Sequence, residues 1–246
     1  MRDVINEQSE KLLAGSLDQY IVFQPVTLND LTEIEARRYI LGKCTRFTHY
    51  IDSKILVIKL TPSVTHEAAH RNFGKEIERK TELMGVSRHD LYSVGAGRFE
   101  VTGKTSKEGD SCYIPNTRRG SWPTLVVEAG LSETLPRLRV EADWWLGNSD
   151  GQVKIVVLLE INKTRKEIRI EQWEIQPPEP TTGRNLAQVA TLMNEVFIDS
   201  NNVITGVPLK LDFRKVFLRP AVPPEEDIEI GSQELTEWAE NLWLNT

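Results

Sequence analysis

The sequence predicts an α/β fold of α+β character, in which one central mixed β-sheet is flanked by helices. Two observations predict it. Strand-like and helix-like segments follow one another in the order strand, long helix, three strands, helix and two strands, which is typical of a layered α/β domain. The segment 124–128, Thr-Leu-Val-Val-Glu, is almost wholly apolar, as expected of a strand that is covered on both faces of a sheet.

The length of 246 residues fits one domain with appendages. We expect a helical lead-in over residues 1–50 and an α/β core over residues 51–176. A C-terminal appendage over residues 177–246 would pack its acidic helix on the core. Three prolines at the start of this appendage (Pro177, Pro178 and Pro180) mark the second boundary, because proline interrupts regular structure.

The lead-in and the start of the core show recognisable helix signals. Residues 1–19 are polar and favour only a weak helix, whereas Asn29-Asp30 is expected to cap a short helix that ends near residue 42. The apolar segment 55–60 predicts a strand. A long helix follows it, with Pro62 in its first turn and Gly85 at its end.

The rest of the core reads as strands around one more helix. We expect strands at 90–101, broken at its glycines, at 109–115 and at 124–128, then a helix at 132–146 and a hairpin at 152–175. The appendage is expected to contain a helix near 185–196, a strand at 207–213 and a final helix at 231–244.

Composition and charge narrow the classes of function. No apolar run approaches the ~18 residues of a membrane span, and the start lacks the apolar stretch of a signal peptide. Cys44 and Cys112 are the only cysteines, which argues against a disulfide scaffold. We therefore expect an intracellular protein, cytoplasmic or nuclear, without a membrane partner. The net charge is −6, but residues 221–246 hold seven acidic residues and no Lys or Arg, so residues 1–220 carry +1 and a nucleic-acid partner stays open.

Two carboxylates are the strongest candidates for a site. Glu128 ends the apolar strand, and a buried carboxylate needs a base, a proton or a metal as partner. Asp110 lies at the preceding strand, and neighbouring strands are only about 4.8 Å apart. Two carboxylates so placed can share a hard cation such as Mg²⁺ or Mn²⁺, which activates water for phosphodiester hydrolysis.

The segment from Ile55 to Trp173 resembles the PD-(D/E)XK nuclease superfamily, and most closely its restriction-endonuclease branch. The resemblance covers about half of the chain. It is carried by Pro62, His66, Asp110, the strand from Pro123 to Glu128, and Ser132. It implies a restriction-endonuclease-like fold, a metal-dependent endonuclease activity on nucleic acid, and Asp110 and Glu128 as metal ligands. A homodimer is compatible with it.

The resemblance also implies further site residues and contains two departures. Glu67 would correspond to the helix glutamate that adds a metal or water contact. Gly109 replaces the motif proline, and Gly130 occupies the place of the motif lysine. A basic residue of the following helix would then replace this lysine, and we choose Arg139, which cannot act as a base but can stabilise negative charge.

Two alternatives remain open. The chain could be a non-catalytic module that binds nucleic acid or protein, an inactive relative in which Glu128 pairs with Arg137, Arg139 or Lys107. The second alternative is a zinc protease, because His66-Glu67-Ala68-Ala69-His70 is an H-E-x-x-H sequence on a helix. A third ligand would then have to come from elsewhere, and the other histidines are His49 and His89.

Overall fold

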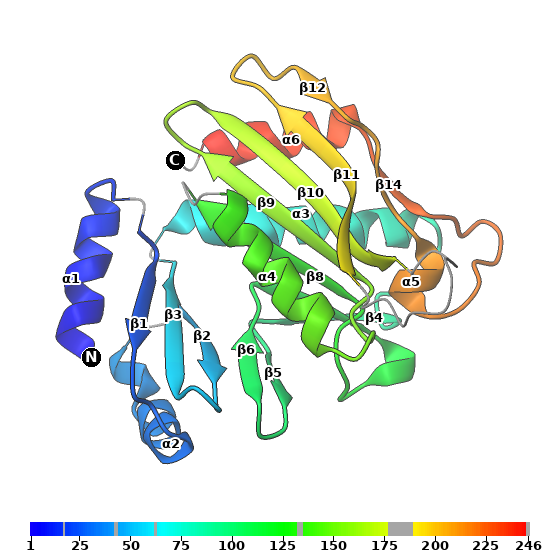
Figure 1. Ribbon diagram of the computed structural model, residues 1–246. Coiled ribbons are helices and arrows are strands. Elements are labelled where there is room, and N and C mark those ends of the chain that lie inside the picture. Colours follow the sequence, from blue (N-terminus) through cyan, green and yellow to red (C-terminus); the bar gives the residue numbers. More distant parts are fainter. Residues whose placement is uncertain (17, 42–43, 62, 132–134, 177–188, 245–246) are drawn as a thin grey trace, which may run out of the picture.

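The computed structural model describes all residues except 17, 42–43, 62, 132–134, 177–188 and 245–246. It confirms the predicted α/β class. A large mixed sheet is flanked by helices, and a second sheet lies below it in Figure 1. None of the helices in the described part of the chain combines the length and apolar character that a membrane crossing requires.

The large sheet has seven strands in the order β12-β11-β10-β9-β8-β7-β4. Its pairs are antiparallel except β8 and β9, which run parallel and are connected through a helix. The strands are β4 (Leu91–Gly95), β7 (Ser111–Pro115), β8 (Leu125–Leu131), β9 (Ile155–Asn162), β10 (Glu167–Gln176), β11 (Val189–Ile198) and β12 (Ile204–Thr205).

Strand β8 lies in the centre and is buried on both faces, as its apolar sequence predicts. Its alternate side chains point to opposite sides. Leu125 and Val127 join the core under helix α3 (Val64–Leu83), whereas Val126 joins the core under helix α4 (Leu135–Asn148). The two helices therefore cover opposite faces of this sheet (Figure 1).

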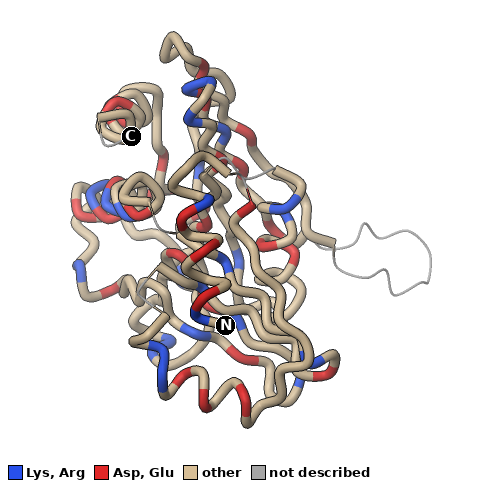
Figure 2. The backbone as a smooth tube through the Cα atoms, turned by 90° about the vertical axis from the view of Figure 1, so that its left-hand side faces the viewer, with Lys and Arg blue, Asp and Glu red and all other residues tan. Residues whose placement is uncertain are grey.

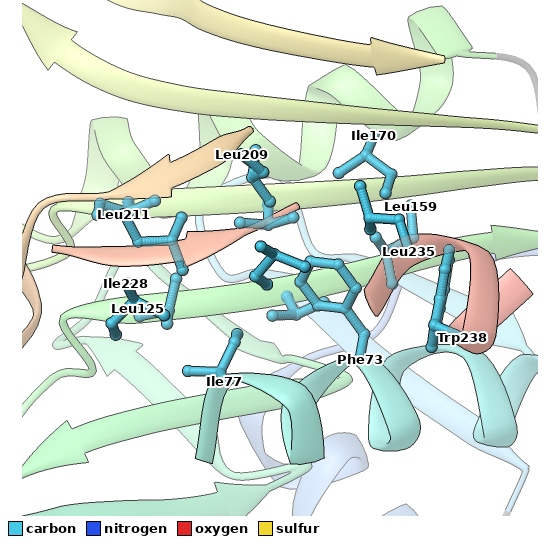
Figure 3. Packing of buried hydrophobic residues seen from close by; sticks show 14 of the residues in the cluster. Phe73, Ile77, Leu125, Leu159, Ile170, Leu209, Leu211, Ile228, Leu235 and Trp238 are labelled. Atoms are coloured by element: carbon cyan, nitrogen blue, oxygen red, sulfur yellow. The ribbon is translucent and has the colours of Figure 1, made fainter. Parts of the chain in front are cut away.

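Helix α3 has the predicted extent. Ser63 caps its first turn by accepting a hydrogen bond from the amide of Thr65, and Gly85 follows its end with a φ of +82°. Phe73 packs edge-on against Trp238 of helix α6 (Ser232–Trp243) in the core shown in Figure 3. Strands β13 (Leu209–Leu211) and β14 (Ile228–Ile230) and the short helix α5 (Phe213–Phe217) complete this layer.

The acidic C-terminal helix is attached to α3 by charge as well as by packing. Lys80 and Arg79 of α3 lie 2.5 and 3.5 Å from the carboxylate of Glu234. The indole N–H of Trp238 donates to the carbonyl oxygen of Ala69 at 3.1 Å. In Figure 2 the helix beside the C mark is acidic, and its neighbour α3 carries both signs of charge.

The second sheet has five antiparallel strands in the order β1-β3-β2-β6-β5. They are β1 (Tyr20–Phe23), β2 (Thr45–Tyr50), β3 (Ile55–Leu60), β5 (Arg98–Val101) and β6 (Thr105–Glu108). One face packs against the N-terminal helices α1 (Arg2–Leu13) and α2 (Leu28–Ala36). The boundary expected at residue 50 thus falls inside a sheet, because β2 of the lead-in pairs along its whole length with β3.

Several local predictions need correction. Residues 189–198 form strand β11 and not a helix, because a tertiary pairing with β10 outweighs the local helix pattern. The segment 90–101 divides at Gly95 (φ +54°), and its halves enter different sheets. Helix α2 is capped by Thr27 rather than by Asn29-Asp30. Pro62, Ser132 and the proline cluster lie outside the described residues.

Candidate functional site

The two predicted carboxylates come together between neighbouring strands of the large sheet. Asp110 directly precedes β7, and Glu128 lies in the middle of β8. Both side chains are fully buried. The amide of Ala129 donates to Oδ2 of Asp110 at 3.1 Å, so the backbone beside Glu128 also holds the aspartate.

An ammonium from the other sheet lies between them. Nζ of Lys59 on β3 is 3.1 Å from Oδ2 of Asp110, 2.7 Å from the carbonyl oxygen of Ala129 and 3.8 Å from Oε2 of Glu128. The lysine is itself buried. Burial alone would raise the pKa of Asp110, but Lys59 and His66 hold this pKa well below its ordinary value.

A second buried lysine compensates the far side of Glu128. Nζ of Lys107 on β6 lies 3.5 Å from Oε1 of Glu128 and donates a hydrogen bond to the carboxylate of Glu141 on α4. The indole N–H of Trp145 donates to the same Oε1 at 2.7 Å. Burial raises the pKa of Glu128 to about 7, although Lys107 and Lys59 act in the opposite direction. The acids raise the pKa of Lys107 above its usual value despite its burial.

The alternation of side chains along strands explains why three cations meet these acids. Arg46 on β2 pairs with Lys59 on β3, and Lys107 on β6 pairs with Thr48, two residues after Arg46. Residues two apart point to the same face of a sheet. One face of the five-stranded sheet therefore presents Arg46, Lys59 and Lys107 to the carboxylates, which we call the cationic face.

His66 of α3 contacts the same centre. Its Nε2 lies 2.9 Å from the carbonyl oxygen of Ala129 and 3.3 Å from Oδ2 of Asp110. Burial lowers the pKa of His66, with Asp110 acting in the opposite direction, so the imidazole is neutral at pH 7. A carbonyl can only accept, and we therefore assign the proton to Nε2.

Glu67 reaches the pair through an arginine. Oε1 of Glu67 lies 3.0 Å from Nη2 of Arg46, whose Nε is 3.3 Å from Oδ1 of Asp110. Arg71 contacts the other carboxylate oxygen of Glu67 at 2.9 Å. The imidazole of His70, whose Nε2 lies 3.6 Å from Oε2 of Glu67, is the main cause that lowers the pKa of Glu67 to about 2, so this carboxylate stays ionised.

The H-E-x-x-H sequence forms a compact group. Each of His66, Glu67 and His70 offers one atom that could ligate a metal, and these three atoms lie within 4.8 Å of one another. Both imidazoles are buried, however, and Nδ1 of His70 contacts the hydroxyl of Ser111 at 2.8 Å. His49 contacts the carbonyl oxygen of Val26 at 2.8 Å, and His89 is exposed after α3, so neither stands beside this group as the expected third ligand.

Arg139 is not brought to the carboxylate pair. Its guanidinium makes two contacts with Glu171 on β10, at 2.5 and 3.0 Å, and stacks near the ring of Trp173. The reason is helix phase, because Leu138 and Ala142 of α4 pack into the core while Arg139 turns toward β10. Among the described residues, the basic groups at the pair come instead from the cationic face.

Lys107 is predicted only as one possible partner of Glu128, and Lys59 is not predicted to belong to the site. The missed signal is a single lysine in the otherwise apolar strand Ile-Leu-Val-Ile-Lys-Leu at 55–60. A lysine buried in such a strand requires an acidic partner. Its strand neighbours do not identify that partner, because Asp110 belongs to the other sheet.

A cavity of about 380 Å³ adjoins Asp110, whereas Glu128 is not among its lining residues. Asp110 and Ser111 line it from the start of β7, and Arg46 lines it from the cationic face. The remaining lining residues come mainly from α3 and β4: His70, Arg71, Lys75, Glu78, Ser93, Gly95, Ala96 and Tyr113. A ligand in this cavity would meet Asp110 and several cations together.

Comparisons with known proteins find a distant structural likeness but no family. Neither a protein-family model nor a curated protein matches the chain. A solved structure of a candidate nuclease belonging to DUF820, from Anabaena variabilis ATCC 29413, is similar over 87% of this chain and 99% of that chain. The identity is 13% and the TM-score is 0.47. A likeness at this level does not bear on the chemistry of the site.

Proposed function

We propose that the chain hydrolyses phosphodiester bonds of nucleic acid with a divalent cation, Mg²⁺ or Mn²⁺, held by Asp110 and Glu128. One observation supports this more than any other. The carboxylates of Asp110 and Glu128 and the carbonyl of Ala129 all face the ammonium of Lys59. Carboxylate and carbonyl oxygens are the ligands that Mg²⁺ takes in proteins. The ammonium of Lys59 lies among these oxygens, where a metal cation would bind.

A bound cation would lower the pKa of water and neutralise charge on a phosphate. The chain's own residues would act around it. Arg46 lines the cavity beside Asp110 and offers guanidinium donors to a phosphate oxygen. Glu67 fixes that guanidinium through its 3.0 Å contact. Gly130 stands at the position of the motif lysine, and Lys59 of β3 would supply the missing ammonium.

A non-catalytic module that binds nucleic acid or protein is the second candidate, and a specific observation favours it. The acidic pair is already compensated inside the fold, by Lys59 on one side and Lys107 on the other. These two lysines compensate the charge of the buried carboxylates without any bound metal. Such a module would bind its partner equally well with or without divalent cations.

The experiment that separates the two candidates is a cleavage assay with the full chain. Single- and double-stranded DNA and RNA are incubated with Mg²⁺, Mn²⁺ or EDTA. We expect cleavage with either metal, none with EDTA, and a loss of at least about 100-fold in the Asp110→Asn and Glu128→Gln variants. The exposed Asp143 on α4 provides the matched control, and Asp143→Asn should cleave like the wild type.

Two outcomes would contradict the proposed activity. The first is wild-type cleavage that Asp110→Asn and Glu128→Gln leave unchanged, which would indicate a contaminating nuclease. The second is metal-independent binding of nucleic acid without cleavage under any condition, which would establish the non-catalytic module instead.

A further inference from the structure

We infer that the ammonium of Lys59 occupies the divalent-cation position itself, so that the resting chain binds metal weakly and gains a metal site when this ammonium is withdrawn. This inference rests on the same acidic pair as the proposed function. It concerns the occupancy of the site and not the reaction.

The contacts of Lys59 are those of a cation in an oxygen cage. An ammonium has three donors and no acceptor. Here it lies 2.7 Å from the carbonyl oxygen of Ala129, 3.1 Å from Asp110 and 3.8 Å from Glu128. These oxygens come from two neighbouring strands of the large sheet, whereas the lysine comes from the other sheet. The acidic pair and its cation are thus supplied by separate layers.

The lysine and a metal ion would exclude each other. Mg²⁺ lies about 2.0–2.1 Å from its oxygen ligands. An ammonium 3.1 Å from Oδ2 of Asp110 and 3.8 Å from Oε2 of Glu128 takes that space and repels a second positive charge at close range. Metal binding by Asp110 and Glu128 therefore requires that Lys59 moves away, which its flexible four-carbon stem allows.

Lys107 does not have this role. It lies on the other side of Glu128, 3.5 Å from Oε1, and donates its hydrogen bond to Glu141. Glu128 would thus keep one compensating cation when Lys59 is withdrawn. Arg46 likewise stays 3.3 Å from Oδ1 of Asp110. Removing the Lys59 charge consequently frees the position between the carboxylates without leaving the acids wholly uncompensated.

The test measures Mn²⁺ binding by the full chain, through calorimetry and through the loss of the free Mn²⁺ signal in electron paramagnetic resonance. We compare the wild type with Lys59→Met, which keeps the length of the side chain and removes its charge. Lys59→Arg keeps the charge and serves as the control. We expect Lys59→Met to bind Mn²⁺ at least about tenfold more tightly than the wild type, a difference of about 1.4 kcal/mol. The double variant Lys59→Met/Asp110→Asn should lose this gain.

A Lys59→Met chain that binds Mn²⁺ no more tightly than the wild type would overturn the inference. If Lys59→Met and a second variant, Lys59→Gln, unfold without metal, refolding on addition of Mn²⁺ supports the inference and failure to refold overturns it. Tighter Mn²⁺ binding by Lys59→Met, together with a wild type that cleaves no substrate with either metal, would leave the inference intact and contradict the proposed activity. Cleavage by a wild type whose Mn²⁺ affinity equals that of Lys59→Met would do the reverse.

Discussion

The two sheets differ in the charge of the side chains that they bring to their mutual contact. The five-stranded sheet buries an apolar face that includes Phe47 and Ile58, and its opposite face is the cationic face. The seven-stranded sheet is apolar on both sides of β8 but carries Asp110 and Glu128 at the contact. Burying the charges of one sheet alone would cost free energy. The cations of the five-stranded sheet and the carboxylates of the seven-stranded sheet compensate each other. The site is therefore a property of the contact between the sheets and not of either sheet.

The largest effect is expected when the cationic face loses Lys107. Lys107→Met leaves Glu128 and Glu141 buried without their shared cation, and breaking a buried ion pair costs about 3–5 kcal/mol. The free energy of unfolding, measured by urea denaturation, should fall by that amount. Lys104 is exposed nearby, and Lys104→Met should change it by less than about 0.5 kcal/mol. Equal losses in both variants would show that the cationic face does not stabilise the acids.

This comparison also shows how far the sequence could predict the molecule. The apolar run before Glu128 identifies β8, and the burial of its carboxylate predicts a charged partner. The partner itself comes from β3 and β6, and β2 joins these strands by pairing Thr48 with Lys107 far along the chain. Such a pairing leaves no local pattern. The same reason explains why a strand was missed at 189–198, where only the partner strand β10 decides the structure.

The next effect concerns the titration of Glu128. Burial raises its pKa in the folded chain to about 7, above the ordinary value of 4.5. Between these two values the unfolded chain loses its proton while the folded chain keeps it, so ionisation destabilises the fold as the pH rises. Glu128→Gln removes this titration. From pH 4 to pH 8 its stability should rise relative to the wild type by about 3 kcal/mol.

Urea denaturation of both chains across this pH range measures the difference directly, because the other titrating groups contribute to both chains. A difference that stays constant from pH 4 to pH 8 would contradict the raised pKa. It would mean that Lys107 and Lys59 outweigh burial and keep Glu128 ionised.

A smaller effect is expected when two tryptophans of one helix are compared, one of which donates to a carboxylate and the other to a hydroxyl. Trp145 of α4 donates to Glu128 at 2.7 Å, and its neighbour Trp144 donates to the hydroxyl of Thr105 at 3.1 Å. A hydrogen bond to a charged group contributes about 1.5–3 kcal/mol, and one between neutral groups about 0.5–1.5 kcal/mol. At pH 8, above the pKa of about 7 of Glu128, Trp145→Phe should therefore destabilise the chain more than Trp144→Phe in thermal or urea denaturation. The opposite order at this pH would indicate that Glu128 stays protonated.

The smallest effect is expected outside the contact between the sheets. Arg139 pairs with Glu171 on the seven-stranded sheet alone, and its side chain is 37% exposed. Glu171 is buried, but it also accepts a hydrogen bond from the indole N–H of Trp173, and Arg139→Gln keeps an amide donor beside it. Arg139→Gln should therefore lower the free energy of unfolding by only about 1 kcal/mol. Its cleavage rate and its Mn²⁺ affinity should stay within about twofold of the wild type, because its observed contacts lie on β10. A large loss of cleavage in Arg139→Gln, with its stability retained, would return Arg139 to the site and would show that the functional charge is not confined to the contact between the two sheets.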